Sequence, residues 1–221
     1  MANTNVMEKN LTAVEVFDRC AHEYQEKFME FALYHDTFDI FCHTIQIKNA
    51  AILELACGPG NVTKYILGKL PDVILLGTDL SPAMLELAKA NNPRAKFVLM
   101  DCREMATLKT KYDGIICGFG LPYLSKPEAI LLITNAAKIL NPHGVLYLST
   151  MEDDYSNSGL KSSSSGEYQT FIHYHEAEYL KTALYENGFA IVDLQRKDYP
   201  GNSDAKDLII IAQLQQTKLS K

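Results

Sequence analysis

The spacing of the hydrophobic positions changes once along the chain. Between Leu11 and Lys48, apolar residues recur at steps of three and four, which is the spacing along one face of a helix. This pattern predicts two helices, with a break near His35 and Asp36. From Ala50 onward the apolar residues form short, nearly continuous runs, which are typical of parallel strands buried on both faces.

Helical stretches separate these apolar runs. The expected strands are residues 50–56, 73–78, 96–100, 112–117 and 145–150, followed by 189–195 and 208–214. The expected helices are residues 61–70, 81–91, 127–140 and 176–187. Strands that alternate with helices predict an α/β fold with a doubly wound parallel sheet. The turn Pro200-Gly201-Asn202 favours a hairpin for the last two strands.

The same pattern divides the chain into an N-terminal helical cap, residues 1–48, and one α/β domain, residues 49–221. Residues 153–170 interrupt the alternation of strands and helices, because they include two glycines and the serine run 162–165. We predict a mobile loop there.

Composition and charge narrow the classes of function. The chain has 27 acidic and 21 basic residues and a net charge of −6, which argues against a nucleic-acid partner. Its five cysteines include no C-x-x-C pair, so we expect reduced thiols and no metal site. No apolar run approaches the roughly 20 residues of a membrane helix, and the first ten residues do not resemble a signal peptide. We therefore expect a cytoplasmic protein that does not bind membranes.

The most informative stretch is Leu53-Glu54-Leu55-Ala56-Cys57-Gly58-Pro59-Gly60, where a buried strand runs into a tight turn that opens a helix. Glycines let the backbone approach a ligand closely, and amides at a helix start can bind its polar edge. Such a turn alone is also compatible with a purely structural role. Asp79 and Asp101, however, end the next two strands, where carboxylates can accept hydrogen bonds from a ribose and an adenine. The three features together predict a nucleoside site at one edge of the sheet.

Two alternatives remain open at this point. A nicotinamide-dependent oxidoreductase would carry G-x-G-x-x-G, but Thr63 stands at the third glycine position and Pro59 lies between the first two. The other alternative is a catalytically silent protein that binds nucleosides as a sensor or scaffold.

The motifs resemble those of class I S-adenosylmethionine-dependent methyltransferases. LELACGPGNVT is similar to their first motif, GTDLSPAMLELAKA to the second and FVLMDCREM to the third. YDGIICGFGLPYL and LNPHGVLYLST resemble their fourth strand and the segment that leads to the fifth. The resemblance covers residues 50–150 and is closest to small-molecule enzymes such as the ubiquinone and menaquinone methyltransferases. Ala56 departs from the family, which usually has glycine there.

The resemblance implies a fold, a cofactor and its contacts. The expected sheet has seven strands in the order 3-2-1-4-5-7-6, one of them antiparallel, and the expected cofactor is S-adenosylmethionine, with S-adenosylhomocysteine as product. Glu54 would order the glycine turn, Asp79 would hold the ribose, and Asp101 would bind the adenine. The other expected cofactor contacts are Tyr24, Ala56, Cys57, Gly58, Gly60, Leu80, Met84, Cys102 and Gly118.

Methyl transfer is an in-line displacement that depends mainly on orientation, and a general base is optional. Candidates for a catalytic role are Tyr123, after the fourth strand, and His173 and His175, which would share one face of an extended segment. The alternative for both histidines is a place at the surface or at a helix cap. The Leu-Pro-Tyr string lacks the acid or amide of the D/N-P-P-Y/F motif, which argues against a nucleobase or glutamine acceptor. We predict a small-molecule acceptor; the methylated atom and the oligomeric state stay open.

Overall fold

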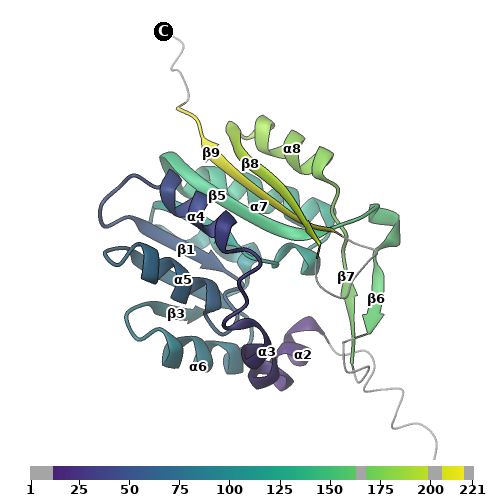
Figure 1. Cartoon of the computed structure of the whole chain (residues 1–221). Coiled ribbons are helices and arrows are strands. Elements are labelled where there is room, and N and C mark those ends of the chain that lie inside the picture. The colour runs from purple at the N-terminus through teal and green to yellow at the C-terminus, as the bar shows by residue number, and fades with distance from the viewer. Residues whose placement is uncertain (1–11, 163–167, 199–205, 217–221) are drawn as a thin grey trace, which may run out of the picture.

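A seven-stranded sheet divides the molecule into two helical layers (Figure 1). The structure is a computed structural model that describes residues 12–162, 168–198 and 206–216 of the 221-residue chain. The strand order is β3-β2-β1-β4-β5-β9-β8. The strands are β1 (Ala51–Leu55), β2 (Ile74–Asp79), β3 (Lys96–Leu99), β4 (Tyr112–Cys117), β5 (Leu140–Glu152), β8 (Phe189–Asp198) and β9 (Lys206–Leu214). The predicted order is confirmed, since an additional hairpin shifts the numbers of the last two strands by two.

The strands from β1 to β5 are parallel, and β9 runs antiparallel between β5 and β8. β9 is therefore the antiparallel strand that the resemblance implied. The predicted pairing of the last two strands is also confirmed. Their connecting turn at Pro200 to Asn202 lies outside the described residues.

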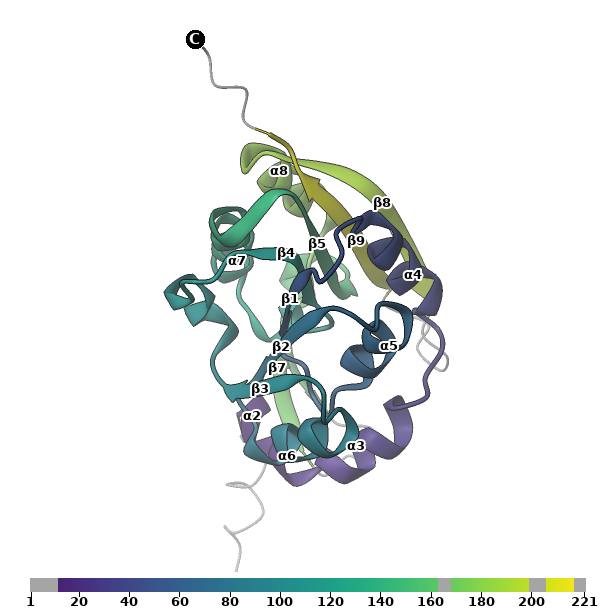
Figure 2. The same cartoon turned by 90° about the vertical axis from the view of Figure 1, so that its left-hand side faces the viewer.

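Helices cover both faces of the sheet (Figure 2). α4 (His35–Thr44) and α5 (Asn61–Lys69) pack on one face, while α7 (Lys126–Ile139) and α8 (Ala177–Glu186) pack on the other. Successive side chains of β1 point to opposite faces of the sheet. Ile52 packs in the core beneath α4 and α5, Leu53 packs in the core beneath α7 and α8, and both are fully buried. Burial on both faces explains why the inner strands are nearly continuous apolar runs.

Side-chain caps fix where several helices begin. Thr12 and Glu15 form a capping box at α2 (Ala13–Arg19), and Ser125 and Glu128 form one at α7. The Ser81 hydroxyl accepts a hydrogen bond from Met84 N at 3.1 Å and so caps α6 (Pro82–Asn91). Each cap satisfies backbone N–H groups that have no partner inside the helix.

The described part of the N-terminal region, from residue 12 onward, contains three helices where two were expected. α2 and α3 (Ala21–Phe28) are separated at Cys20, and α4 begins at His35, so the break precedes His35. α4 packs against one face of the sheet, because its Phe41 side chain is fully buried in the core between them. Only α2 and α3, hereafter the cap, lie over the ends of the strands (Figure 1).

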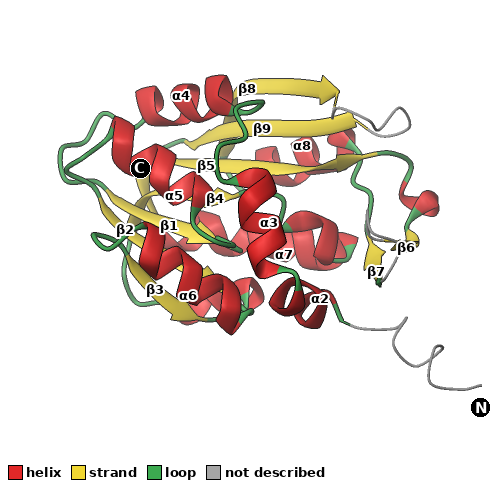
Figure 3. Cartoon of the chain, turned by 60° about the horizontal axis from the view of Figure 1, so that its bottom comes forward, coloured by secondary structure: helices red, strands yellow, loops and turns green. Residues whose placement is uncertain are grey.

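The segment expected as a loop contains regular structure in its described part. The turn η4 (Tyr155–Asn157) leads into β6 (Gly159–Ser162), which pairs antiparallel with β7 (Gln169–Ile172) outside the main sheet (Figure 3). Leu160 pairs with Phe171 across this hairpin. Its tip, residues 163–167, lies outside the described residues.

Candidate functional site

A cavity of about 270 Å³ opens at the carboxyl ends of β1, β2, β3 and β4, beneath the cap. Most of the predicted site residues line it. They are Tyr24, Ala56, Gly58, Asp79, Leu80, Met84, Asp101, Cys102, Gly118 and Tyr123. Residues far apart in the sequence therefore meet in one site, at the edge of the sheet where parallel α/β folds bind ligands.

The glycine turn has left-handed backbone at alternate positions. Ala56, Gly58 and Gly60 have φ angles of 51°, 53° and 80°. Cys57 N donates to Thr78 O at 2.9 Å, which ties the turn to the neighbouring strand. The positive φ at Ala56 gives a conformational reason for glycine at the equivalent position of the resembling family. This geometry leaves the Gly58 backbone at the cavity wall.

A matched pair of glycines tests the strain in this turn. A Cβ on Gly60 would lie 2.4 Å from Asn92 Nδ2 and 3.3 Å from the Ala88 backbone, whereas one on Gly68 in α5 meets nothing within 4 Å. We expect Gly60→Ala to lower the free energy of unfolding by about 1–3 kcal/mol. Gly68→Ala should raise it by about 0.5–1 kcal/mol. Urea unfolding measures both, and a Gly60→Ala protein as stable as the wild type would contradict the strain.

Asp79 joins the glycine turn to α6. Its Oδ2 accepts from Gly58 N and its Oδ1 from Ser81 N, both at 2.9 Å. Burial raises the pKa of this carboxyl, and the backbone hydrogen bonds oppose that rise. A carboxylate has about four acceptor positions, so these two bonds leave room for two ligand hydroxyls.

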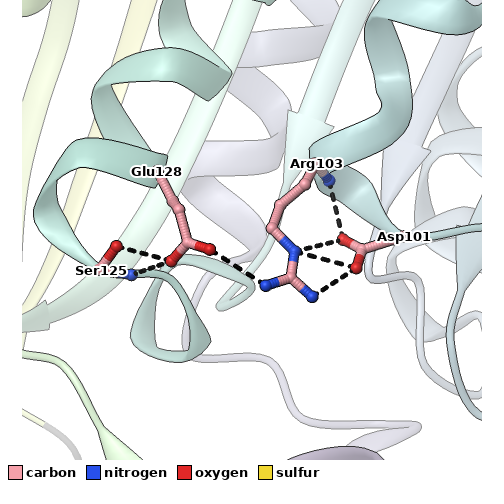
Figure 4. A network of polar contacts seen from close by, with 4 residues as sticks. All are labelled: Asp101, Arg103, Ser125 and Glu128. Carbon is pink, nitrogen blue, oxygen red and sulfur yellow. Dashed lines mark hydrogen bonds and ion pairs between the residues drawn. The ribbon is translucent and has the colours of Figure 1, made fainter.

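Asp101 is held by an arginine that the sequence analysis did not identify (Figure 4). Arg103 Nε lies 3.0 and 2.9 Å from the two carboxylate oxygens of Asp101, and Arg103 Nη2 lies 2.5 Å from Oδ2. Arg103 Nη1 also donates to Glu128 at 3.0 Å. Burial alone would raise the pKa of Asp101, but the hydrogen bonds and charge of Arg103 keep it below the usual value. Asp101 is therefore an ionised acceptor, linked to the start of α7.

Three predicted cofactor residues do not line the cavity. Glu54 is buried behind the turn and accepts a hydrogen bond from the Thr63 hydroxyl. Cys57 packs in a small apolar cluster with Leu85, and Gly60 precedes α5 in left-handed conformation. These three residues shape the turn from behind.

The burial of Glu54 predicts a pH dependence of stability. Burial raises its pKa from 4.5 to about 8, so between these values the folded chain holds a proton that the unfolded chain has released. Its contribution to stability is therefore complete below about pH 4.5 and is lost as the pH rises toward about 8. Unfolding of the ligand-free protein across this range should show a steeper fall for the wild type than for Glu54→Gln. Exposed Glu86 provides the control, Glu86→Gln. Parallel profiles for Glu54→Gln and the wild type would contradict the raised pKa.

The structure separates the two candidate histidines by environment. Their rings lie 6.4 Å apart, and His173 lines a pocket that adjoins the cavity. His175 is fully buried; its Nε2 donates to Leu121 O at 2.8 Å and its Nδ1 accepts from Tyr179. Burial lowers the pKa of His175 to about 4, so it stays neutral. These contacts indicate a structural role for His175.

The cap is fastened to α6 by side chains of α2 and α3. Asp18 Oδ1 accepts from the Ser81 hydroxyl at 2.7 Å and from Ala83 N at 2.9 Å. Gln25 Oε1 accepts from Asn91 Nδ2 at 2.7 Å. Phe17 and Tyr24 pack edge to face over the cavity, with ring centroids 5.6 Å apart.

The remaining lining residues were not predicted. They are Thr12, Ala13, Val14, Phe17, Met100, Arg103, Phe119, Gly120 and Leu124. Four of them lie in α2 or directly before it, namely Thr12, Ala13, Val14 and Phe17. Their position in the cavity wall depends on how α2 packs against the rest of the molecule. Arg103 carried a local signal, because it stands two residues after an expected ligand acid.

The strand order and the cavity at the carboxyl ends of the strands are those of the class I methyltransferase architecture. Comparison with known proteins supports this assignment of the fold. Residues 52–144 match the family model described as "Methyltransferase domain". The chain is 39% identical over 94 residues to trans-aconitate 2-methyltransferase of Methylobacterium radiotolerans, covering 42% of this chain and 35% of that protein. It is 32% identical over 110 residues to malonyl-[acyl-carrier protein] O-methyltransferase of Halalkalibacterium halodurans, covering 47% and 40%.

A solved structure shows the same fold over nearly the whole chain. Magnesium protoporphyrin IX methyltransferase from Synechocystis, with bound S-adenosylmethionine, superposes with a TM-score of 0.67 at 16% identity, covering 91% of this chain and 94% of that one. The chain spans well under half the length of both curated relatives. Residues 52–144 are thus similar to a methyltransferase domain, and the fold of the described chain is that of the class I, S-adenosylmethionine-dependent enzymes.

Proposed function

We propose that this chain transfers a methyl group from S-adenosylmethionine to a small-molecule acceptor. The observation that carries the proposal is the meeting of the glycine turn, Asp79 and Asp101 around one cavity. A nucleoside with an extended side chain would occupy this cavity along the glycine turn. A Cβ on Gly58 would come within 3.7 Å of Tyr24, and one on Gly118 within 3.8 Å of Val62, so the missing side chains leave space along the wall.

Each wall of the cavity has a role in this proposal. Asp79 accepts the ribose hydroxyls with its remaining acceptor positions, and Asp101 accepts the adenine amino group beside the Cys102 amide. Leu80 and Met84 supply apolar contacts to the nucleoside, since both line the same cavity. The turn from Ala56 to Gly60 passes the methionine portion, with Glu54 behind it.

The chemistry requires alignment and exclusion of water. S-adenosylmethionine supplies a sulfonium methyl, and its leaving thioether is neutral and needs no acid. The rings of Phe17, Tyr24 and Tyr123 line one side of the cavity, with Phe17 and Tyr123 5.3 Å apart. Aromatic faces attract a cation by about 0.5–2 kcal/mol each. These rings therefore favour the charged donor over the neutral product.

Composition supports further parts of the proposal. The net charge of −6 favours a small-molecule partner over a nucleic acid. All five cysteines are free, which agrees with a place in the reducing cytoplasm. Among the described residues no helix is long and apolar enough to cross a membrane.

Calorimetry on the intact chain tests the proposal. S-adenosylmethionine and S-adenosylhomocysteine should bind, and NAD should not. Micromolar NAD binding without S-adenosylhomocysteine binding would overturn it. Incubation of metabolite extracts with methyl-labelled donor then separates an enzyme from a silent binding protein, since only the enzyme yields a labelled product.

A further inference from the structure

A second pocket, of about 440 Å³, adjoins the cofactor cavity. The two share Thr12, Ala13 and Tyr123 in their walls. The pocket lies between the start of α2, the turn η3 (Leu121–Tyr123) and the β6–β7 hairpin. Figure 1 shows α2 beside β7, and the two elements are in contact. A molecule in this pocket would approach the cofactor cavity past Tyr123.

The described lining of this pocket carries no carboxylate, lysine or arginine. It consists of the three shared residues with Leu160, Thr170, Phe171 and His173. Leu160 and Phe171 are 54% and 47% exposed, and their pairing across the hairpin forms an open apolar wall of this pocket. The nearby cations lie over other rings: Lys161 over Tyr174 at 5.2 Å and Arg19 over Tyr168 at 5.9 Å. An uncharged, apolar occupant suits these walls.

The described lining holds two titratable side chains, Tyr123 and His173, and His173 is the one whose ordinary pKa lies near neutrality. Its Nδ1 lies 3.2 Å from the Tyr155 hydroxyl, and its backbone N–H donates to Pro122 O at 2.8 Å. The Tyr155 ring stacks on the imidazole, with centroids 5.9 Å apart and an interplanar angle of 18°. Nε2 has no hydrogen-bond partner among the residues that the structure describes. The ring is thus fixed through one nitrogen, while the other is available to a ligand.

We propose that this pocket binds the methyl acceptor, and that the acceptor is an uncharged aromatic molecule methylated on a phenol-type hydroxyl. The inference rests on the proposed function. Phe171 and Leu160 would cover the faces of the aromatic ring, and the hydroxyl would meet His173 Nε2 near Tyr123. The acceptor class differs from the carboxylate acceptors for which the two curated relatives are named.

The step balances with the groups present. The hydroxyl oxygen forms a bond to the methyl carbon with one of its electron pairs. The carbon–sulfur bond breaks, and its electron pair stays on sulfur as a neutral thioether. The hydroxyl proton moves to His173 Nε2, and the imidazolium then releases it to water.

The surroundings of His173 suit a proton acceptor at neutral pH. Burial lowers the pKa of His173, and the negative charge of Glu128 partly opposes this. The neighbouring His175 is neutral, and the Tyr155 side chain contacts the His173 ring through its Oη. The ring therefore carries no proton on one nitrogen near pH 7.

Binding to the full chain loaded with S-adenosylhomocysteine tests the pocket, with 2-naphthol as the probe and 2-naphthoate as its charged counterpart. We expect 2-naphthol to bind, and Phe171→Ala to weaken that binding at least fivefold. Leu131→Ala, at an equally exposed leucine on α7, should leave it unchanged. Tighter binding of 2-naphthoate, or no effect of Phe171→Ala, would overturn the inference. Absence of S-adenosylhomocysteine binding would instead overturn the proposed function.

His173→Gln tests the base. Since general bases contribute about 10²–10⁴-fold, methylation of 2-naphthol should fall at least about a hundredfold. The affinity for 2-naphthol should stay within twofold. Wild-type activity should rise with pH through the His173 pKa, which lies below 6.5, and the variant should lose that rise. Unchanged transfer by His173→Gln would refute its role.

Discussion

Asp79→Ala is expected to weaken the binding of S-adenosylhomocysteine at least tenfold. The change removes two hydrogen bonds to a charged acceptor, each contributing about 1.5–3 kcal/mol. It also releases Gly58 N and Ser81 N, which the carboxylate holds at 2.9 Å. Calorimetry at constant salt measures the loss.

Two further variants separate binding from folding. Asp72→Ala removes an exposed acid outside the cavity and should leave affinity unchanged. Asp79→Asn keeps the size of the side chain and an oxygen acceptor but removes the charge, and should bind with intermediate affinity. If folded Asp79→Ala binds as tightly as the wild type, Asp79 does not hold the cofactor.

Deletion of residues 1–29 is expected to abolish methyl transfer while leaving a folded domain. Within the described chain, no residue of α2 or α3 belongs to the cores on the two faces of the sheet. The deletion removes Phe17 and Tyr24 from the cavity and opens it to water. Cofactor affinity should fall about tenfold or more, since desolvated contacts are lost on one side. Calorimetry, circular dichroism and labelled transfer measure the three outcomes.

A point variant supports the deletion. Asp18→Ala removes the bonds from α2 to Ser81 and Ala83, so it should weaken cofactor binding with little effect on the unfolding temperature. Glu26→Ala, on α3, changes an acid for which no bond is described and provides the control. A truncated protein that still methylates its acceptor normally would show that the two helices only stabilise the fold.

The sheet was predictable because its signal is local. Burial on both faces demands continuous apolar runs, and these marked the inner strands β2, β1, β4, β5 and β9. The edge strands β3 and β8 are half-buried or exposed over most of their length. The β6–β7 hairpin gave no such signal, because it stands outside the core and one of its strands runs into serines. Its described strands pair Leu160 with Phe171, a contact that no short sequence window contains.

The residues of the candidate site that lie at the ends of strands were predictable from the sequence. Asp79 is the last residue of β2 and Asp101 lies two residues after β3, so their meeting in one cavity follows from parallel pairing. Arg103 and the cap residues needed tertiary docking to be placed. The different environments of His173 and His175 were also not predictable from the sequence. β7 ends at Ile172, and the backbone N–H groups of His173 and His175 then donate to Pro122 O and Met151 O.

The position of the β6–β7 hairpin has an evolutionary consequence. It lies between β5 and α8 in the chain, and its described strands share no hydrogen-bonded ladder with the main sheet. Substitutions in it can therefore accumulate at small cost to global stability, while those around the glycine turn disturb a strained and buried structure. The family match ends at residue 144, before the hairpin begins. The matched residues include most of the described lining of the donor cavity, whereas the hairpin lines the pocket that we propose for the acceptor, so similarity to relatives reports the donor better than the acceptor.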